Sequence, residues 1–338
     1  MQLVLNTHGA YLHRHEGMFR VKVEDQIHDV SAKKVESILI STSATISTDA
    51  IKLAMDYNID IIFLDHFGEP YGRVWHSKLG STTLIRRRQL EVADTEIGME
   101  LALEWIGNKF DNQIDYLTRL RENRTRKSSE ITEELQRLRE YREKLGILSG
   151  TIDEKRSEIM GLEGVSGRVY FQVLSFCLPE KFRFEGRSRN PAKDEFNCFL
   201  NYGYGVLYGL VEKACILAGL DPYVGIIHTD HYNKKSLVFD LIENYRIWTD
   251  ETVMGLFSSR KIEDSFFQKI EGGMVLDKPG KTALLEALNE FLDTAVRYRG
   301  RNIKRRDIVQ FDCHRIANKL IGKEIADEED RESGVGAV

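Results

Sequence analysis

The sequence of 338 residues has few cysteines and no long apolar segment, and both facts narrow what the protein can be. Its four cysteines (Cys177, Cys198, Cys215 and Cys313) form no CxxC pair, which argues against a zinc site or a disulfide framework. We expect small buried residues in a reducing compartment. No apolar run is long enough to cross a bilayer and the first residues lack a signal-peptide pattern, so we expect a cytoplasmic protein with no membrane partner.

The sequence also lacks a nucleotide-binding motif. GYGVLYG at 203–209 has the spacing GxGxxxG instead of GxGxxG and lies in an aromatic, helix-like stretch, where small residues favour helix packing. PGKT at 279–282 resembles the end of a phosphate-binding loop, but the first glycine that such a loop needs falls on Val275. We interpret Pro279 as the start of a helix and expect no nucleotide cofactor.

A positive net charge is absent as well, because the formal net charge is -5. The segment from Glu324 onward carries six acids and one arginine and accounts for all of that charge. We predict that residues 326–338 form a flexible acidic tail. Local clusters matter more than net charge for binding phosphate groups. In the formally neutral remainder, basic residues gather at 86–88, at 121–127, around Arg187 and at 299–306.

Two kinds of periodicity meet near residue 80 and predict an α+β fold. Residues 1–80 contain short alternating or apolar runs, such as MFRVKV and IDIIFL, which predict strands. One helix interrupts them, with Thr48 as its N-cap and Asn58 ending it in a left-handed conformation. Residues 81–325 have helical periodicity instead. The prediction is a small N-terminal β-rich domain with one helix, followed by a larger all-α domain.

The helices predicted in the second domain include a highly charged hairpin. In SSEITEELQRLREYREKL at 128–145, Ile131, Leu135, Leu138 and Leu145 recur at heptad-like steps with charges between them. This pattern predicts one limb of a helical hairpin that packs on the body of the domain. Further helices are predicted at 91–110, 111–123, 157–176, 194–218, 236–246 and 281–297.

The segment SLVFDLIENYR at 236–246 places two acids together. Its apolar residues follow a helical period with Ser236 as N-cap, and on a helix Asp240 and Glu243 share one face, whereas on a strand they would point to opposite faces. Neighbouring acids on a helix are most often solvated, so alone they do not indicate a site. His228 precedes this helix by eight residues, so its imidazole can fold back over the first turns.

Glu163 lies in GLEGVSGR at 161–168, among Gly161, Gly164 and Gly167. Each glycine inside a helix costs about 1 kcal/mol, so three of them within one segment need a reason. Close approach of another helix is one reason, and it would make Glu163 incidental. Close approach of a ligand is the other.

Glu163, Asp240, Glu243 and His228 together form an oxygen-rich set with one imidazole, which suits Mn²⁺ or Mg²⁺ better than zinc. Beside arginine and lysine clusters, such an ion can activate a phosphodiester while the bases hold a nucleic-acid backbone. A generic phosphodiesterase dependent on Mn²⁺ or Mg²⁺ fits these residues. A non-catalytic nucleic-acid-binding scaffold, in which the acids are structural, fits them as well.

Four motifs follow one another in a specific order and spacing: GLEG, RNPAKDEFNCFLNYGYGVLYG at 189–209, AGLDPYVGIIH at 218–228 and SLVFDLIENYR. Through them, and over nearly its whole length, the sequence resembles the CRISPR-associated adaptation endonuclease and integrase family, the larger of the two universal spacer-acquisition proteins. The resemblance departs at Asn244 and Tyr245, where the family often has proline and phenylalanine.

The resemblance implies roles for individual residues. Glu163, His228 and Glu243 would be the metal ligands, and Asp240 an adjacent acid of the catalytic set that shares or tunes the site. Asn197, Tyr204 and Arg246 fall on positions that the family places near the cleft. With the basic residues Arg187, Arg189, Lys234 and Lys235, they are the residues predicted to contact DNA.

The resemblance also implies the reaction and the partners. The all-α domain would be the catalytic domain of a DNA endonuclease and integrase dependent on Mn²⁺ or Mg²⁺. The 3′-hydroxyl of a short foreign duplex would attack a phosphodiester at the leader end of a CRISPR array, inserting a new spacer without ATP. The expected partners are double-stranded and branched DNA, a second copy of the chain bound through the N-terminal domain, and the small second universal CRISPR adaptation protein.

Overall fold

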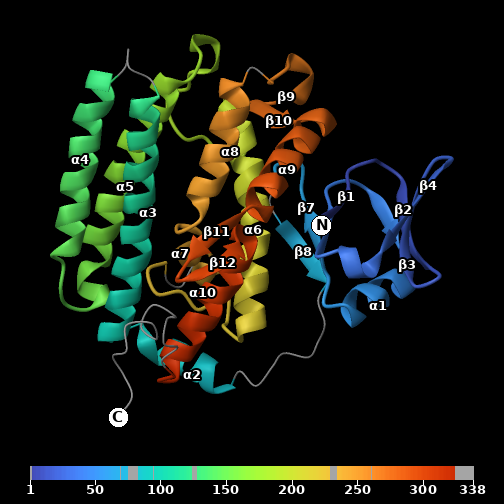
Figure 1. Ribbon diagram of the computed structural model, residues 1–338, viewed down its shortest axis with the longest axis horizontal. Coiled ribbons are helices and arrows are strands. Elements are labelled where there is room, and N and C mark those ends of the chain that lie inside the picture. Colours follow the sequence, from blue (N-terminus) through green and yellow to red (C-terminus); the bar gives the residue numbers. More distant parts are fainter. Residues whose placement is uncertain are drawn as a thin grey trace. The chain divides into compact units, whose positions relative to one another are not determined.

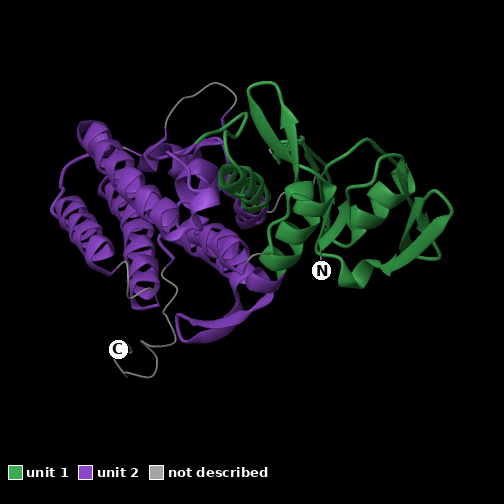
Figure 2. Ribbon diagram, turned by 90° about the horizontal axis from the view of Figure 1, so that it is seen from above, with its two compact units in different colours: residues 1–79, 188–209, 261–289 green, residues 80–187, 210–260, 290–338 purple. Residues whose placement is uncertain are grey.

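The computed structural model shows two compact units, coloured separately in Figure 2. Unit 1 comprises residues 1–79, 188–209 and 261–289, and unit 2 comprises residues 80–187, 210–260 and 290–338. The structure describes residues 2–68, 70–74, 83–93, 95–123, 128–228, 234–259 and 261–323. The predicted domain boundary at residue 80, the basic residues 124–127 and the acidic tail lie outside the described residues. The predicted α+β class is confirmed, with a β-rich start followed by mostly helical structure (Figure 1).

Two four-stranded sheets form the N-terminal part of unit 1. One sheet has the order β1-β5-β7-β8, in which the first three strands are parallel and the last is antiparallel. The other has the order β4-β3-β2-β6, in which β2 and β6 are parallel and the remaining pairs antiparallel. The strands are β1 (Gln2–Leu5), β2 (Ala10–His15), β3 (Met18–Val23), β4 (Gln26–Ser31), β5 (Ser37–Ile40), β6 (Ala44–Ile46), β7 (Asp60–Leu64) and β8 (Pro70–Val74).

The helix α1 (Thr48–Asp56) and both sheets share one hydrophobic core. Leu12, Phe19, Ile38, Ala54 and Ile61 are all fully buried in it. The alternation of apolar residues along the strands produces this core, because successive side chains of a strand point to opposite faces.

The ends of α1 test two predictions. Its N-cap is Ser47 and not Thr48, because the Ser47 hydroxyl accepts the amide proton of Ala50 at 3.2 Å and Thr48 is already helical. Asn58 has a φ of 55°, as predicted for the residue that ends this helix.

Unit 2 is built on three helices that pack side by side, α3 (Glu96–Glu122), α4 (Ser128–Gly146) and α5 (Ile152–Cys177) (Figure 1). The four apolar residues predicted to hold the charged hairpin, Ile131, Leu135, Leu138 and Leu145, are the buried residues of α4. A capping box of Thr151 and Glu154 begins α5. The other helical elements are α2 (Thr83–Val92), α6 (Glu195–Ala218), α7 (Ser236–Ile242), α8 (Arg246–Ser258), α9 (Lys278–Asp293), α10 (Arg305–Leu320) and the 3₁₀ turns Ala32–Lys34, Glu180–Phe182 and Asp264–Phe266.

Several predicted helix boundaries differ in the structure. The predicted helices 91–110 and 111–123 form one helix, α3, preceded by α2. The predicted helix 236–246 ends at Ile242, and its N-cap is Lys235 and not Ser236. The predicted helix 281–297 begins earlier, at Lys278, with Pro279 in its first turn, and ends at Asp293.

Two short hairpins lie within the region expected to be helical. They are β9 (Phe267–Ile270) with β10 (Gly273–Leu276), and β11 (Ala295–Tyr298) with β12 (Arg301–Lys304). Arg299 and Gly300 join the second pair and both have positive φ, which is the backbone of a tight turn that matches the twist of a hairpin. None of the helices in the described part of the chain is long and apolar enough to span a membrane.

Candidate active site

Unit 2 brings together side chains from four places in the chain. Lys109 comes from α3, Glu163 from α5, His228 from the loop before α7, and Glu243 from the residue that caps the C-terminus of α7. The predicted residues Glu163, His228 and Glu243 therefore belong to one compact unit, and Lys109 is an addition that the sequence did not suggest.

Asp240 holds the loop that carries His228. Its Oδ2 accepts the backbone N–H groups of Ile226 at 2.6 Å and Ile227 at 3.1 Å. Its Oδ1 accepts the backbone N–H of His228 at 3.0 Å and contacts the Nδ1 atom of that residue at 2.7 Å. Both oxygens of the buried carboxylate are thus occupied, and the expected fold-back of the imidazole over α7 is observed.

The same hydrogen bonds orient the imidazole. A proton on Nδ1 points at the Asp240 carboxylate, so in the neutral ring the lone pair is on Nε2. This is the usual arrangement of a histidine that binds a metal through one nitrogen and a carboxylate through the other. Arg156 of α5 donates to the carbonyl of Ile227 at 3.1 Å and supports the loop from the other side.

Gly225 allows the loop to lie close to α7. A Cβ atom at this position would lie 2.2 Å from the carbonyl oxygen of His228 and 2.6 Å from the Cβ of Ser236. Any side chain would push the His228 loop away from the helix that anchors it. The glycine of GIIH is therefore required by the backbone path.

Lys109 links the two glutamates. Its Nζ lies 2.5 Å from Oε1 of Glu163 and 2.6 Å from Oε2 of Glu243. The other oxygen of Glu243, Oε1, accepts Nε–H of Arg246 at 2.8 Å. Both oxygens of Glu243 thus face cations, and the side chain is only 5% exposed.

The charges of this cluster shift the protonation of its members. Burial alone favours the neutral Glu243, but Arg246 and Lys109 outweigh it and lower the pKa of Glu243 to about 2. Burial likewise favours the neutral Lys109, yet Glu243 and Glu163 raise the pKa of the ammonium. For His228, burial is opposed by the hydrogen bond and charge of Asp240, so its pKa is raised. Lys109 and Glu243 are therefore both charged at neutral pH.

The open question about the acids of 236–246 has an answer in their burial. Asp240 is fully buried and Glu243 nearly so, which is incompatible with a solvated helix face. The two side chains also have different partners, since Asp240 binds backbone amides and Glu243 binds Lys109 and Arg246.

The glycines around Glu163 do not pack against another helix. A Cβ built at Gly161, Gly164 or Gly167 would meet no atom within 4 Å beyond the helix itself. Helix packing is therefore not the reason for these glycines. They leave an uncovered strip of α5 beside Glu163. Of the two reasons suggested for these glycines, the close approach of a ligand is the one that remains.

Asn244 ties α3 to the turn between α7 and α8. Its side-chain oxygen accepts Nδ2–H of Asn108 at 3.0 Å, and its backbone carbonyl accepts Nδ2–H of Asn112 at 3.0 Å. Its own Nδ2–H donates to the carbonyl of Leu241 at 3.0 Å. Asn108 and Asn112 flank Lys109 on α3, so these bonds set the position of the lysine relative to Glu243.

The residues of unit 2 that were predicted to contact DNA differ in how far their side chains are exposed. Lys234 is exposed, whereas Nζ of Lys235 lies 2.6 Å from a carboxylate oxygen of Glu212. Arg187 is half-buried, with its guanidinium 5.3 Å from the centre of the Phe171 ring. Arg246 is engaged with Glu243. In this conformation Lys234 is the one among the four whose side chain is exposed.

The other predicted DNA contacts belong to unit 1. Arg189 is exposed. Asn197 is fully buried, where its Oδ1 accepts the backbone N–H of Ser188 at 3.3 Å and its Nδ2–H donates to Asp194 at 2.6 Å. Tyr204 is buried as well. Asn197 thus shapes the segment that carries Arg189 from within the unit.

The donor set fits a divalent metal in its chemistry. Two carboxylates and one neutral imidazole nitrogen are suitable ligands for Mn²⁺ and Mg²⁺. Across the residues that the structure describes, no three histidine, cysteine or acidic side chains converge as closely as a metal site requires. Lys109 lies between the two glutamates, and its cationic Nζ contacts the same oxygens that a metal would use.

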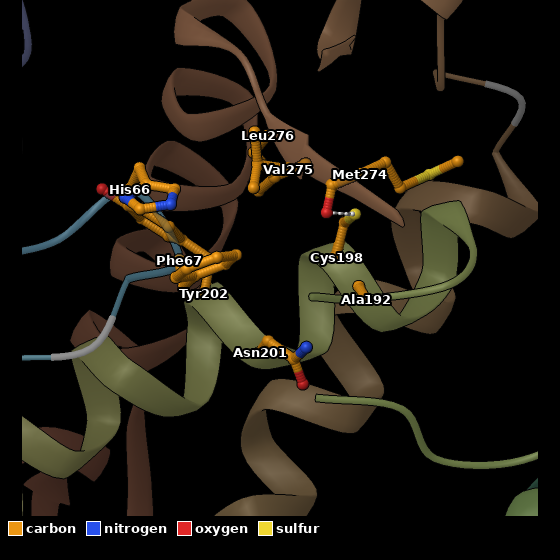
Figure 3. A pocket seen from close by; sticks show the side chains of 9 residues that line it. All are labelled: His66, Phe67, Ala192, Cys198, Asn201, Tyr202, Met274, Val275 and Leu276. Carbon is orange, nitrogen blue, oxygen red and sulfur yellow. Dashed lines mark hydrogen bonds between the residues drawn. The ribbon is translucent and has the colours of Figure 1, made fainter. Parts of the chain in front are cut away.

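Cavities also lie outside this cluster. The one in Figure 3, in unit 1, has a volume of about 10 Å³, room for one water molecule, and is lined by residues that include Cys198 and Tyr202. Burial raises the pKa of the Cys198 thiol, which donates to the carbonyl of Met274 at 3.3 Å and is no nucleophile. All four cysteines are buried, as expected.

The second cavity, in unit 2, is open and has a volume of about 530 Å³. Its wall contains three acids and two arginines, and one of the arginines, Arg119, is paired with Glu251. A wall with more acids than bases does not suit a phosphate group. Neither cavity is therefore a better candidate for the active site than the carboxylate cluster.

The chain matches one protein family over most of its length. Residues 3–290 match the family model of "CRISPR associated protein Cas1". The chain is 34% identical over 336 residues to the CRISPR-associated endonuclease Cas1 1 of Archaeoglobus fulgidus, a match that covers 96% of this chain and 97% of the relative.

Two solved structures share the fold. A casposase bound to integration product matches with a TM-score of 0.83 and 23% identity, over 100% of this chain and 95% of that one. A Cas6-RT-Cas1--Cas2 complex matches with a TM-score of 0.78 and 21% identity, over 95% of this chain and 35% of that one.

Proposed function

Because the chain belongs to the family of CRISPR-associated protein Cas1, we propose that it is a DNA endonuclease and integrase that inserts short foreign DNA into a CRISPR array. The observation that carries the proposal is the buried cluster of unit 2, in which Glu163 and Glu243 face one cation and Asp240 orients His228. Charged groups with shifted pKa values that gather in one place are typical of a functional site.

The reaction is a transesterification that needs no nucleotide. A 3′-hydroxyl oxygen forms a bond to the phosphorus of the target strand, and the bond from that phosphorus to the departing 3′ oxygen breaks. The attacking hydroxyl loses one proton and the departing oxygen gains one. The number of phosphodiester bonds is unchanged, which agrees with a sequence that has no nucleotide-binding motif.

Glu163, Glu243 and Nε2 of His228 would hold Mn²⁺ or Mg²⁺. When bound, such an ion polarises the phosphoryl oxygen and stabilises the leaving oxygen. Asp240 keeps the proton of His228 on Nδ1, so that Nε2 is free to act as a ligand. Since the pKa of His228 is raised, a proton competes for Nε2 as the pH falls.

The DNA would reach the cluster over the uncovered strip of α5. The three glycines beside Glu163 let a phosphate backbone come closer than any side chain would allow. Exposed Lys234 and Arg189 would bind phosphates outside the cluster, and Arg246 would do so if it leaves Glu243.

The partners follow from the same family. We propose that the protein binds double-stranded and branched DNA, assembles with Cas2, the small second universal CRISPR adaptation protein, and forms a homodimer through its N-terminal β-rich domain. A complex that contains both Cas1 and Cas2 is among the structures with this fold. The cytoplasmic location remains a prediction from the sequence.

A cleavage and strand-transfer assay tests the function. With Mn²⁺, the protein should nick duplex DNA and resolve branched DNA that mimics an integration product, and Glu163→Ala should lose both activities while it still binds DNA. A plain phosphodiesterase would nick but not rejoin strands. A scaffold would bind without cleaving, and that outcome would refute the proposal.

A further inference from the structure

Lys109 occupies the position between Glu163 and Glu243 at which the proposed metal has to bind. We infer that its ammonium is a built-in counterion, exchanged for a divalent cation when the site is loaded. The inference rests on the proposed metal site and concerns how that site is kept ready and how tightly it binds metal.

The occupancy of Glu243 carries the argument. Oε2 contacts Lys109 at 2.6 Å and Oε1 contacts Arg246 at 2.8 Å, and the side chain is only 5% exposed. Both oxygens of this nearly buried carboxylate therefore already face a cation, and a third positive charge would be repelled by both bases. To coordinate Glu243, a metal has to replace one of the two bases.

Lys109 is the base that can leave. Arg246 stands three residues after Glu243 at the start of α8, so its contact is set by local geometry. Lys109 reaches the acids from another helix by a flexible four-carbon stem, and Asn108 and Asn112 fix the α3 backbone to the turn at Asn244. The ammonium can therefore move by rotation of its own side chain while the helices stay in place.

Electrostatics explains why a counterion is needed before metal arrives. Two carboxylates that share one site repel each other and favour a proton on one of them. The ammonium of Lys109 contacts both at 2.5 and 2.6 Å and so offsets this repulsion. The two carboxylates are then held close together, and the exchange leaves a positive charge tethered beside the loaded site.

The exchange predicts a specific cost. A metal that has to displace Lys109 binds less tightly than it would at the same acids without the lysine. We expect that Lys109→Met, which keeps the length of the side chain but not its charge, binds Mn²⁺ more tightly than the wild type by about tenfold or more. Without metal this variant should melt at a lower temperature, and Mn²⁺ should raise its melting temperature more than that of the wild type.

The experiment is titration calorimetry with MnCl₂ together with thermal unfolding in EDTA and in Mn²⁺, on the full chain. Lys319→Met is the matched control. Lys319 lies on α10 and pairs at 2.7 Å with Glu100, which lies on α3 as Lys109 does, and this pair does not involve Glu163 or Glu243. Its Mn²⁺ affinity should equal that of the wild type.

The outcomes separate the inference from the proposed function. Weaker or equal Mn²⁺ binding by Lys109→Met, in a wild type that binds Mn²⁺ and cleaves DNA, overturns the inference alone. A wild type that neither binds Mn²⁺ nor cleaves DNA overturns the proposed function. A variant that unfolds in EDTA but folds in Mn²⁺ supports the exchange, and one that stays unfolded in Mn²⁺ contradicts it.

Discussion

Asp240 and Glu243 are three residues apart, yet their surroundings give them different tasks. Asp240 accepts three backbone amides and a ring nitrogen, and so its oxygens are saturated by the loop at 226–228. Glu243 contacts two cationic side chains, Lys109 and Arg246. This difference supports the interpretation that Asp240 positions His228 and that Glu243 is the ligand.

Asp240→Asn should act mainly by weakening the hydrogen bonds that hold the loop at 226–228. Its amide nitrogen would face N–H donors, leaving buried groups without partners, at a cost of about 1–3 kcal/mol of unfolding free energy. The Mn²⁺ affinity should fall roughly 10- to 100-fold because His228 is no longer oriented. Urea unfolding and calorimetry measure the two effects. A variant of wild-type stability and affinity would show that the four hydrogen bonds do not position His228.

Acid should destabilise the protein through Glu243. Its pKa is lowered from 4.5 when unfolded to about 2 when folded. The stabilising contribution is therefore fully present above about pH 4.5 and is lost as the pH falls toward 2. The charges of Arg246 and Lys109 outweigh the effect of burial, and the difference in pKa corresponds to a contribution of the order of 3 kcal/mol.

Glu243→Gln provides the comparison. The unfolding free energy of the wild type should fall more steeply between pH 4.5 and 2 than that of the variant, as measured by urea unfolding at several pH values. If the unfolding free energies of wild type and variant fall equally between pH 4.5 and 2, the pKa of Glu243 in the folded protein is not lowered.

At the level of the site, the sequence predicted what local spacing determines. The fold-back of His228 over α7 follows from eight residues of separation. The helical period predicted a helix that carries Asp240, and Glu243 caps the C-terminus of that helix. Lys109 could not be found this way. It is the single lysine of α3, with no motif around it. It lies 54 residues before Glu163, and the two become neighbours only when α3 and α5 pack together.

The charged hairpin shows how well a strong periodic pattern predicts an element. Each of the four residues predicted to face the body is buried in α4. Leu135→Ala should lower the free energy of unfolding by about 2–5 kcal/mol, because it leaves a cavity at a fully buried position. Leu90→Ala on α2, at a position 66% exposed, should change it by less than about 0.5 kcal/mol. Equal effects in chemical denaturation would mean that α4 does not pack as described.

The ends of helices and the short hairpins were less predictable. The turn at Arg299 and Gly300 places an arginine at positive φ, whereas Asn-Gly or Asp-Gly would have signalled a hairpin. Without that signal, 294–297 continued the helical pattern of α9. At 236–246 the helix ends at Ile242 because the chain turns into α8 immediately, and no glycine or proline marks the turn.

On the scale of the whole molecule, the edge of one sheet is the best candidate for the proposed homodimer contact. The strand β4 ends the order β4-β3-β2-β6, and its first four residues are exposed, with Ile27 at 54%. A strand with unpaired backbone groups and an exposed apolar side chain tends to pair with another chain.

Ile27→Asp should therefore convert the protein from dimer to monomer. Light scattering on the full chain should give twice 38.9 kDa for the wild type and a single chain mass for the variant. Ile147→Asp, at an 81% exposed position after α4, should leave the dimer intact. A dimer that persists in Ile27→Asp but dissociates in Ile147→Asp would place the interface on the helical part instead.

The distances along the chain between the partners of the site have a consequence for folding kinetics. Asp240 and His228 are 12 residues apart, so their contact closes a short loop and can form early. Asn108 and Asn244 are 136 residues apart, and contacts of such high contact order form slowly, after the helices have docked. We expect a newly made chain to orient its histidine first and to bring its two glutamates together last. A nuclease centre completed only at the end of folding gives immature chains no opportunity to cut the DNA of their own cell.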